Sequence, residues 1–453
     1  MQKTCNRNLI DILGDYTFKT SDWEVFDIRI DIPAFSFGSD AINHQTQYSN
    51  PLVFLTTGQT SGVGIGFTLG DGNDLLCQSI KKLLSKWNGI KLQHLLEKDG
   101  LLYRFLANPD QLRWLSPNSG LVYMAASVIL NTLLDWASKK QGFPLWKSLS
   151  LEPSENLIKL IDTQNIHPFF NKDYSFDCLE RGLVGIEDRI DVIEAKGIPV
   201  YYTTWIGESS NDLIMNINQV NKSHGIKNFK IKINADAKLM QDKIGNIKKG
   251  INPDIVLFSD SNQSLSFTEA CDIVKILDDY SIVWLEEPFA PDNVRLHKTL
   301  MEHIKSNKLQ LEIVTGENCP NAHTALSFIQ ENGCDRFQID ACRVMSYCDI
   351  LPILIACNES KTPVVPHAGG SGLDELVLHI TALNHARIRT DEDISNSLTE
   401  YIGFCSSLYK HPVKVMDGHA ALPTAPGYIN NVSSLVYDAL KADSNMETTW
   451  LKL

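Results

Sequence analysis

The sequence predicts an α/β protein in which an α+β first domain precedes a modified (β/α)8 barrel. Three observations lead to this fold class. From about residue 197, seven short apolar runs alternate with amphipathic helical stretches, the pattern of buried parallel strands and their crossover helices. An eighth run near 394–402 completes the number that a closed barrel needs. Before residue 197, alternating strands precede long helices, which indicates a separate α+β unit. An open, doubly wound sheet is the structural alternative.

The first domain opens with strands in which apolar and polar residues alternate. This alternation over 25–32 is typical of a strand that is buried on one face. The run 52–57 and the turn-rich stretch 58–68 extend the pattern to a β-meander. Two helices are then expected, at 74–87, where apolar residues recur on one face, and at 119–138.

The second half repeats a strand and a helix in every unit. One expected helix is 212–224, which ends before Gly225, and another begins at Pro320, a favoured first helical residue. The seven apolar runs between the helices are 198–204, 229–233, 255–260, 282–287, 312–317, 336–340 and 363–367.

Composition excludes several classes of protein. The 453 residues are 43% hydrophobic and 21% charged, which is ordinary for a globular chain. With 41 Lys and Arg against 54 Asp and Glu the net charge is −13, so a dedicated nucleic-acid binder is not expected. Ten cysteines without CxxC or zinc-finger spacing indicate free thiols in a reducing compartment. The longest apolar run, 121–130, is too short to span a bilayer, and the N-terminal residues lack a signal-peptide pattern. We therefore expect an intracellular protein without a membrane partner.

Ionisable residues close most of the apolar runs in the second half, at spacings of 23 to 31 residues. Since the carboxyl ends of barrel strands converge on one face, these residues should meet in a ring. Asp260, Glu286 and Glu317 stand at three successive strand ends, and Glu287 follows Glu286. Three carboxylates without Cys or His are the hard oxygen ligands that suit Mg²⁺. Any one carboxylate alone could instead cap the following helix.

Two further pairs point to acid–base chemistry. Lys230 and Lys232 are two residues apart in one predicted strand, so their side chains share a face. Mutual repulsion and a nearby Mg²⁺ would favour a neutral lysine near pH 7, which could act as a base. His367 and Asp340 end neighbouring strands, where the carboxylate would orient the imidazole.

Two glycine-rich stretches have different interpretations. The stretch 368–372 follows His367 and opens a helix, so its backbone amides could hold an anionic group. The stretch 62–72 does not open a helix after a strand in a βαβ unit, so a dinucleotide-binding fingerprint is not expected there. We interpret it as a series of tight turns in the first domain.

These residues together resemble the enolase superfamily, mandelate racemase group. Within that group the sequence motifs are similar to those of the L-fuconate dehydratases and their mitochondrial animal relatives. The resemblance covers nearly the whole chain and is specific as a set. It rests on GSDA (38–41), QLRWL (111–115), FKIKI (229–233), SDSNQ (259–263), WLEEP (284–288), TGENC (315–319), QIDACRV (338–344), PHAGGSGLDELVLH (366–379) and TEYI (399–402).

The resemblance implies a role for each matching residue. The three strand-end carboxylates, Asp260, Glu286 and Glu317, would bind Mg²⁺. Lys232 would be the base, and Lys230 with the metal would hold the substrate carboxylate. His367 would be the acid, oriented by Asp340. Glu400 matches a family active-site carboxylate, and Asn262 matches a position near the substrate.

The implied domains are an α+β cap over residues 1–145, a connector over 146–196, the catalytic barrel over 197–410, and a segment over 411–453 that returns to the cap. The implied function is a Mg²⁺-dependent hydro-lyase acting on a small-molecule sugar acid, with L-fuconate as the expected substrate. It would remove the C2 proton and the 3-hydroxyl and give a 2-keto-3-deoxy acid. Alternatives are another acid-sugar dehydratase, an epimerase or racemase, or a silent homologue with a binding role. A homo-oligomer in the cytoplasm or the mitochondrion is expected.

The chain departs from the family pattern at three places near the expected barrel mouth. Ser264 and Leu265 stand where an Arg-Trp pair is usual, and Asn234 stands where a glycine is usual. The loop at 205–207 is about two residues shorter. These departures bear on the identity of the substrate more than on the chemistry.

Overall fold

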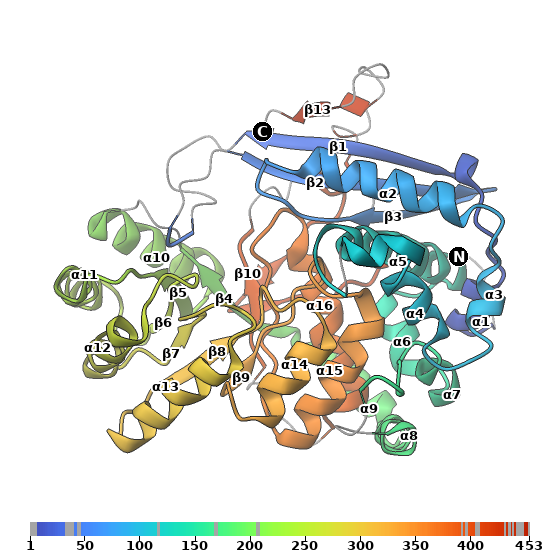
Figure 1. Cartoon of the computed structure of the whole chain (residues 1–453). Coiled ribbons are helices and arrows are strands. Elements are labelled where there is room, and N and C mark those ends of the chain that lie inside the picture. Colours follow the sequence, from blue (N-terminus) through green and yellow to red (C-terminus); the bar gives the residue numbers. More distant parts are fainter. Residues whose placement is uncertain are drawn as a thin grey trace.

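Two β-sheets organise the protein, one in the first domain and one that forms the barrel (Figure 1). The observed fold is therefore the α/β class predicted from the sequence. The computed structural model describes residues 7–31, 40–42, 47–115, 118–166, 171–204, 209–390, 393–394, 397–403, 408–429, 432–433, 436, 439–440 and 448–451.

The first sheet has the order β13-β1-β2-β3. Strands β1 (Trp23–Asp31), β2 (Gln47–Thr57) and β3 (Thr60–Ile65) form the predicted antiparallel meander. Strand β13 (Thr448–Leu451) pairs in parallel with β1, so the last described residues lie beside the first strand. The helices of this part are α1 (Leu9–Gly14), α2 (Asn73–Trp87), α3 (Leu92–Leu95), α4 (Leu101–Ala107) and α5 (Gly120–Gln141), with 3-10 turns η1 (Thr20–Asp22) and η2 (Asp110–Trp114).

Helix α5 packs directly against β3, and the glycines of β3 make this approach possible. A Cβ atom at Gly64 would overlap the Thr132 hydroxyl of α5. Glycine at 64 therefore serves close strand–helix contact, so our interpretation of this stretch as tight turns was wrong for β3. Among the described residues, α5 is the one helix long and apolar enough to cross a membrane, but 83% of its most apolar window is buried inside the protein.

The stretch 146–196, expected as a connector, is mostly helical over its described residues. Its helices are α6 (Leu145–Leu151), α7 (Ser154–Ile158), α8 (Lys172–Arg181) and α9 (Ile186–Lys196).

Parallel strands in sequential order build the barrel. They are β4 (Ile198–Thr203), β5 (Asn228–Lys232), β6 (Val256–Asp260), β7 (Trp284–Glu286), β8 (Glu312–Thr315), β9 (Arg336–Phe337) and β10 (Thr399–Tyr401). The hairpin of β11 (Val415–Met416) and β12 (His419–Ala420) pairs antiparallel with β4. The helices around the barrel are α10 (Ser210–His224), α11 (Ala237–Gly250), α12 (Phe267–Asp279), α13 (Val294–Ser306), α14 (Ala322–Gln330), α15 (Ser346–Ser360) and α16 (Leu373–Leu383), followed by the π-helical turn η3 (Asn384–Ile388).

The barrel closes through an incomplete seventh position. Val364 makes a parallel bridge to Phe337 of β9, and the backbone N–H of Glu400 donates to Pro366 O at 3.3 Å. Strand β10 then pairs with β4 and completes the ring. The predicted strand 363–367 is not a regular strand, because Pro363 and Pro366 cannot donate ladder hydrogen bonds.

Helix α14 begins at Ala322 and not at Pro320 as predicted. The side chain of Asn321 accepts a hydrogen bond from the Thr324 N–H and caps the helix, which moves the start two residues along. Helix α10, in contrast, ends before Gly225 as expected from the sequence.

The barrel interior is layered. Aromatic and aliphatic side chains from five positions around the ring form one buried cluster: Tyr201, Phe258, Trp284, Val314 and Val365. Four of these stand two residues before Thr203, Asp260, Glu286 and His367. Because residues i and i+2 of a strand share a face, the polar residues form the next layer toward the strand ends. The apolar layer is therefore the floor of the site.

Candidate active site

A cavity of about 250 Å³ lies above this floor, between the strand ends and the first domain. Its size suits a small ligand, just below the usual range for drug-sized molecules. The barrel contributes most of its polar wall and the first domain contributes most of its apolar wall. The lining residues are Asp40, Ile42, Tyr48, Phe67, Leu69, Thr203, Lys230, Lys232, Asn262, Gln263, Glu317, Asn318, Arg343, His367, Gly369 and Glu400.

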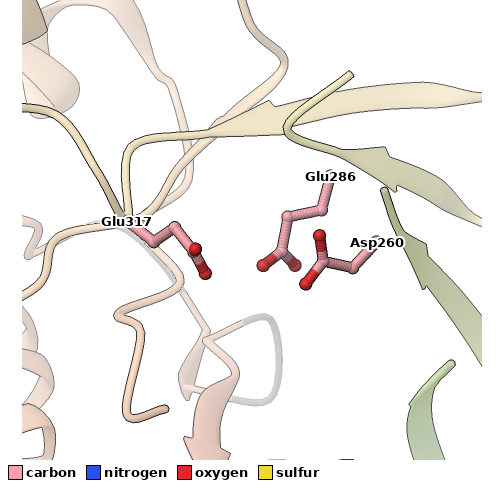
Figure 2. Close-up of side chains that lie close together, drawn as sticks. All are labelled: Asp260, Glu286 and Glu317. Atoms are coloured by element: carbon pink, nitrogen blue, oxygen red, sulfur yellow. The ribbon is translucent and has the colours of Figure 1, made fainter. Parts of the chain in front are cut away.

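Three carboxylates converge beside this cavity (Figure 2). Asp260 ends β6, Glu286 ends β7, and Glu317 follows β8; one oxygen of each lies within 4.8 Å of the others. Glu286 Oε2 is buried and has no hydrogen-bond partner among the described residues. Burial and the charge of Asp260 raise the pKa of Glu286 to about 8. This crowded set of carboxylates, with one buried oxygen unpartnered, has the chemistry of a divalent-cation site.

Glu317 reaches the cluster because a glycine precedes it. Gly316 has φ +130°, and a Cβ atom there would overlap the backbone carbonyl oxygen of Gln338 on the neighbouring strand. Only glycine adopts this conformation without strain at so close a contact. The glycine therefore allows β8 to end abruptly and turns Glu317 toward the cluster.

Both lysines of β5 lie in the same charged layer. Lys230 Nζ is 2.6 Å from Glu286 Oε1 and 3.1 Å from Glu400 Oε1, and Lys232 Nζ contacts Asp260 Oδ2. Burial alone would lower the pKa of each lysine, but the surrounding carboxylates outweigh it and raise both pKa values. The chain's own carboxylates therefore favour the charged form of both lysines. The neutral lysine expected beside a bound Mg²⁺ stays a prediction.

His367 lies on the other side of the carboxylate cluster. Its Nδ1 is 2.8 Å from Asp340 Oδ2, which is the pair expected from the sequence, and its Nε2 is 2.9 Å from Glu317 Oε2. Burial would lower the pKa of His367, but Glu317, Glu400 and Asp340 raise it well above its ordinary value. The imidazolium form is thereby favoured, so this histidine can carry a proton into the cavity.

Glu400 joins the two halves of the site. Its carboxylate accepts hydrogen bonds from the Thr203 hydroxyl and from the Ala368 N–H, the latter at 2.6 Å. Lys230 and His367 hold its pKa at about 2, although burial alone would raise that pKa. The backbone amide of Ala368 is thus already bound by a carboxylate of the protein, which limits the anion site expected at 368–372.

Asn262 lies at the cavity but has a second contact. Its Oδ1 accepts a hydrogen bond of 2.9 Å from the N–H of Ala41 in the first domain, and its own N–H donates to Asp260 Oδ1 at 2.9 Å. Asn262 therefore links the first domain to the loop that carries a candidate metal ligand.

The comparisons with known proteins bear on this arrangement. A family model described as enolase C-terminal domain-like matches residues 212–430. The crystal structure of human mitochondrial enolase superfamily member 1 is 30% identical to this chain, with a TM-score of 0.85, and covers 91% of this chain and 93% of that one. The chain belongs to the enolase superfamily. Membership confirms the resemblance found in the sequence.

Other enolase-superfamily relatives are acid-sugar dehydratases. The L-galactonate dehydratase of Hypocrea jecorina is 29% identical over 408 residues, which are 89% of each protein. The structure of L-talarate dehydratase from Polaromonas sp. JS666 complexed with Mg and L-glucarate has a TM-score of 0.67 and covers 92% of this chain and 95% of that one. At 18% identity the latter likeness is one of fold.

Several cavity residues of this enolase-superfamily protein were not anticipated. Gln263, Asn318 and Arg343 line the cavity, and Arg343 forms no ion pair with a carboxylate among the described residues. Each follows a predicted strand-end residue by one to three positions, so the loops as well as the strand ends supply the site. The apolar lining from β2 and from the residues after β3 had no signal in the sequence, because strand alternation does not show what covers a strand.

The described departures from the family pattern do not line the cavity. Leu265 is buried in the barrel core, and Asn234 accepts a hydrogen bond from the Asp236 N–H at 3.0 Å. Neither they nor Ser264 are among the described residues that line the cavity. The expectation that positions 234, 264 and 265 influence the substrate stays a prediction, and 205–207 lie outside the described residues.

Proposed function

We propose that the protein is a Mg²⁺-dependent sugar-acid dehydratase, and that L-fuconate is its substrate. It would remove the C2 proton and the 3-hydroxyl of the acid and release a 2-keto-3-deoxy acid. One observation carries the proposal: a cluster of three carboxylates has Lys232 at one side and His367 at the other, beside one small cavity. A cation site between a base and an acid is the arrangement that elimination next to a carboxylate requires.

The residues present fit a magnesium ion. Asp260, Glu286 and Glu317 would hold it, and the buried, unpartnered Oε2 atom of Glu286 supports this assignment. When bound, Mg²⁺ would supply positive charge that stabilises the negative charge developing on the substrate carboxylate as the neighbouring proton leaves. Lys230, buried beside Glu286 and Glu400, would contribute a second fixed positive charge to the same carboxylate.

Lys232 would take the proton from C2. Its contact with Asp260 keeps it an ammonium ion in the chain alone. A cation held by the three carboxylates would offset their negative charge, so they would no longer stabilise the ammonium form of Lys232. Burial would then favour the free amine of Lys232. The free amine would accept the C2 proton, and Lys232 would be an ammonium ion again after this step.

His367 would donate a proton to the leaving 3-hydroxyl, which departs as water. Asp340 holds Nδ1, so the proton to be donated is on Nε2, the nitrogen that faces the carboxylate cluster. The enol that results would take a proton at C3 and become the 2-keto-3-deoxy acid. Glu400, 3.7 Å from Nε2, would help to keep the imidazolium charged until transfer.

The sugar-acid class is supported by the relatives that act on such acids. L-fuconate is the 6-deoxy form of L-galactonate, so the proposed substrate and the substrate named for the Hypocrea jecorina relative differ by one hydroxyl. Both acids belong in the first assay.

The test is a screen of sugar acids with Mg²⁺ that measures 2-keto-3-deoxy product, with EDTA as the control. Turnover of L-fuconate that EDTA abolishes is the expected result. Exchange of the C2 proton with deuterium but no product would favour an epimerase or racemase. Neither turnover nor exchange with any acid would contradict catalysis and favour a binding role.

Two variants test the assigned roles. Lys232→Ala should lose both turnover and C2 exchange while Mg²⁺ still binds, and retained exchange would remove Lys232 as the base. His367→Asn should retain C2 exchange but lose elimination, and normal elimination would remove His367 as the acid. Lys275→Ala is the matched surface control, because within the described part of the chain Lys275 forms one ion pair, with the exposed Asp272 at 3.6 Å.

A further inference from the structure

Glu287 is a buried carboxylate next to the site, and the proposed mechanism gives this residue no role. Its side chain has no exposed surface, and it does not line the cavity. It follows Glu286 at the end of β7, with φ +41°. A glutamate in the left-handed region is strained and persists only where surrounding contacts hold it.

Those contacts come from two amide residues that line the cavity. Gln263 Nε2 donates to Glu287 Oε2 at 2.9 Å. The backbone N–H of Asn318 donates to Oε1 at 3.2 Å, and Asn318 Nδ2 donates to Oε2 at 3.1 Å. Asn318 Nδ2 also donates to Glu317 Oε1 at 2.8 Å. Glu287 is therefore surrounded by N–H donors that belong to the cavity wall.

These bonds decide which way the two amides face. A side-chain amide has an NH₂ donor on one side and a carbonyl acceptor on the other. With both NH₂ groups directed at Glu287, the carbonyl oxygens of Gln263 and Asn318 are left without a partner among the described residues. Neither oxygen is among the buried unpartnered atoms, and both residues line the cavity.

The backbone supports the same arrangement. Asn262 and Gln263 also have positive φ values, +43° and +65°, and the Gln263 N–H donates to Glu287 O at 2.7 Å. Three strained residues on two neighbouring loops are thus tied to one another beside the cavity. Strain of this kind clusters at sites where a side chain must be aimed.

We propose that Glu287 is a positioning residue that turns the amides of Gln263 and Asn318 so that their carbonyl oxygens form a wall of hydrogen-bond acceptors. This wall recognises donor groups, the hydroxyls of a polyhydroxy acid beyond C3. The inference deepens the proposed function and rests on it for the class of ligand. The selectivity belongs to Glu287, although that residue never touches the ligand.

The experiment measures affinity separately from turnover. Dissociation constants are measured by calorimetry with Mg²⁺ for L-galactonate and its 4-, 5- and 6-deoxy analogues, the last being L-fuconate. A Lys232→Ala background keeps the acids from being consumed. Loss of a hydroxyl that bonds the wall should weaken binding about tenfold, the value of one hydrogen bond. Product formation by the unmodified protein is assayed in parallel, so that failure of the proposed function is seen independently.

Glu287→Gln is the deciding variant. It keeps the size of the side chain but replaces one acceptor oxygen by an NH₂ group. That group faces either the NH₂ groups of Gln263 and Asn318 or the backbone N–H of Asn318, so the donors that fix the two amides can no longer all be satisfied. The ratio of the dissociation constants for the deoxy acid and the hydroxylated acid should then fall from about ten to about one. Glu331→Gln, the same change at an exposed glutamate, should keep the ratio of the parent. A purely structural role would weaken all acids equally and leave the preference unchanged.

An unchanged preference in Glu287→Gln, or no preference in the parent, would overturn the proposal. If Glu287→Gln does not fold, Gln263→Met and Asn318→Leu each remove one acceptor together with one side-chain donor to Glu287, whose other donors remain. Loss of preference in either supports the wall, and full preference in both overturns it.

Discussion

Replacing Lys230 by methionine should destabilise the protein and make its stability depend on Mg²⁺. Lys230 is fully buried, and its Nζ lies 2.6 Å from Glu286, 3.1 Å from Glu400 and 3.6 Å from Asp260. Methionine has nearly the same length and fills the space, so the change removes charge and leaves little cavity. Three buried carboxylates would then share a smaller positive charge.

The magnitude follows from these contacts. Removal of one partner of a buried ion pair costs about 3–5 kcal/mol, because the remaining charge stays buried without compensation. Burial and Asp260 already raise the pKa of Glu286 to about 8, so Glu286 would take up a proton readily and keep the loss within this range. A cation at one hundred times its dissociation constant restores about 2.7 kcal/mol. We therefore expect a loss of about 3–5 kcal/mol in EDTA, of which roughly half returns with Mg²⁺.

The assay is urea unfolding followed by tryptophan fluorescence and by circular dichroism, with EDTA or saturating Mg²⁺. Lys275→Met is the control, because its exposed pair with Asp272 is worth at most about 1 kcal/mol. A loss in Lys230→Met no larger than in this control, or a loss that Mg²⁺ leaves unchanged, would refute the view that Lys230 compensates a cation-binding carboxylate cluster.

Three further changes have defined outcomes. Asp340→Asn removes the charge-assisted bond to His367, worth about 1.5–3 kcal/mol, and should lower kcat about 10- to 100-fold in the product assay while Mg²⁺ titration is unchanged. Burial raises the pKa of Asp374 from 3.8 to about 7. The buried carboxylate therefore lowers the free energy of unfolding more and more as pH rises from about 4 to 7. Asp374→Asn should become more stable relative to the parent across that pH range, measured by urea unfolding. Gly64→Ala should lower the unfolding free energy by about 1–3 kcal/mol and depress Tm in calorimetry, since the new methyl group overlaps Thr132; an unchanged Tm would contradict the packing described.

Much of the site could be predicted because barrel strands repeat at regular spacing. Asp260, Glu286 and Glu317 were predicted from their places at strand ends, and they form one cluster. Lys230 and Lys232 were predicted to share a face from their two-residue spacing, and both contact this cluster. Periodicity is local, so it survives in a single sequence. The pairing of His367 with Asp340 was found on the same basis.

The errors arose where a neighbour in space outweighed a local signal. Pro320 reads as a helix start, but Asn321 supplies the cap. Glycines of β3 read as turns, but Gly64 makes room for α5. In each case the deciding contact is made by an atom that no pattern of residue types specifies.

The sequence alone determined the order of the elements, the closed barrel and the candidate ligands, because all three depend on periodicity and on the spacing of strand ends. Only the tertiary structure decided the charge state of the lysines and the direction of the amides. Those depend on Glu400, 170 positions from Lys230, and on Glu287, whose left-handed backbone turns it away from the cavity. Electrostatic energy and hydrogen-bond direction depend on distance and angle, and these exist only once the chain has folded.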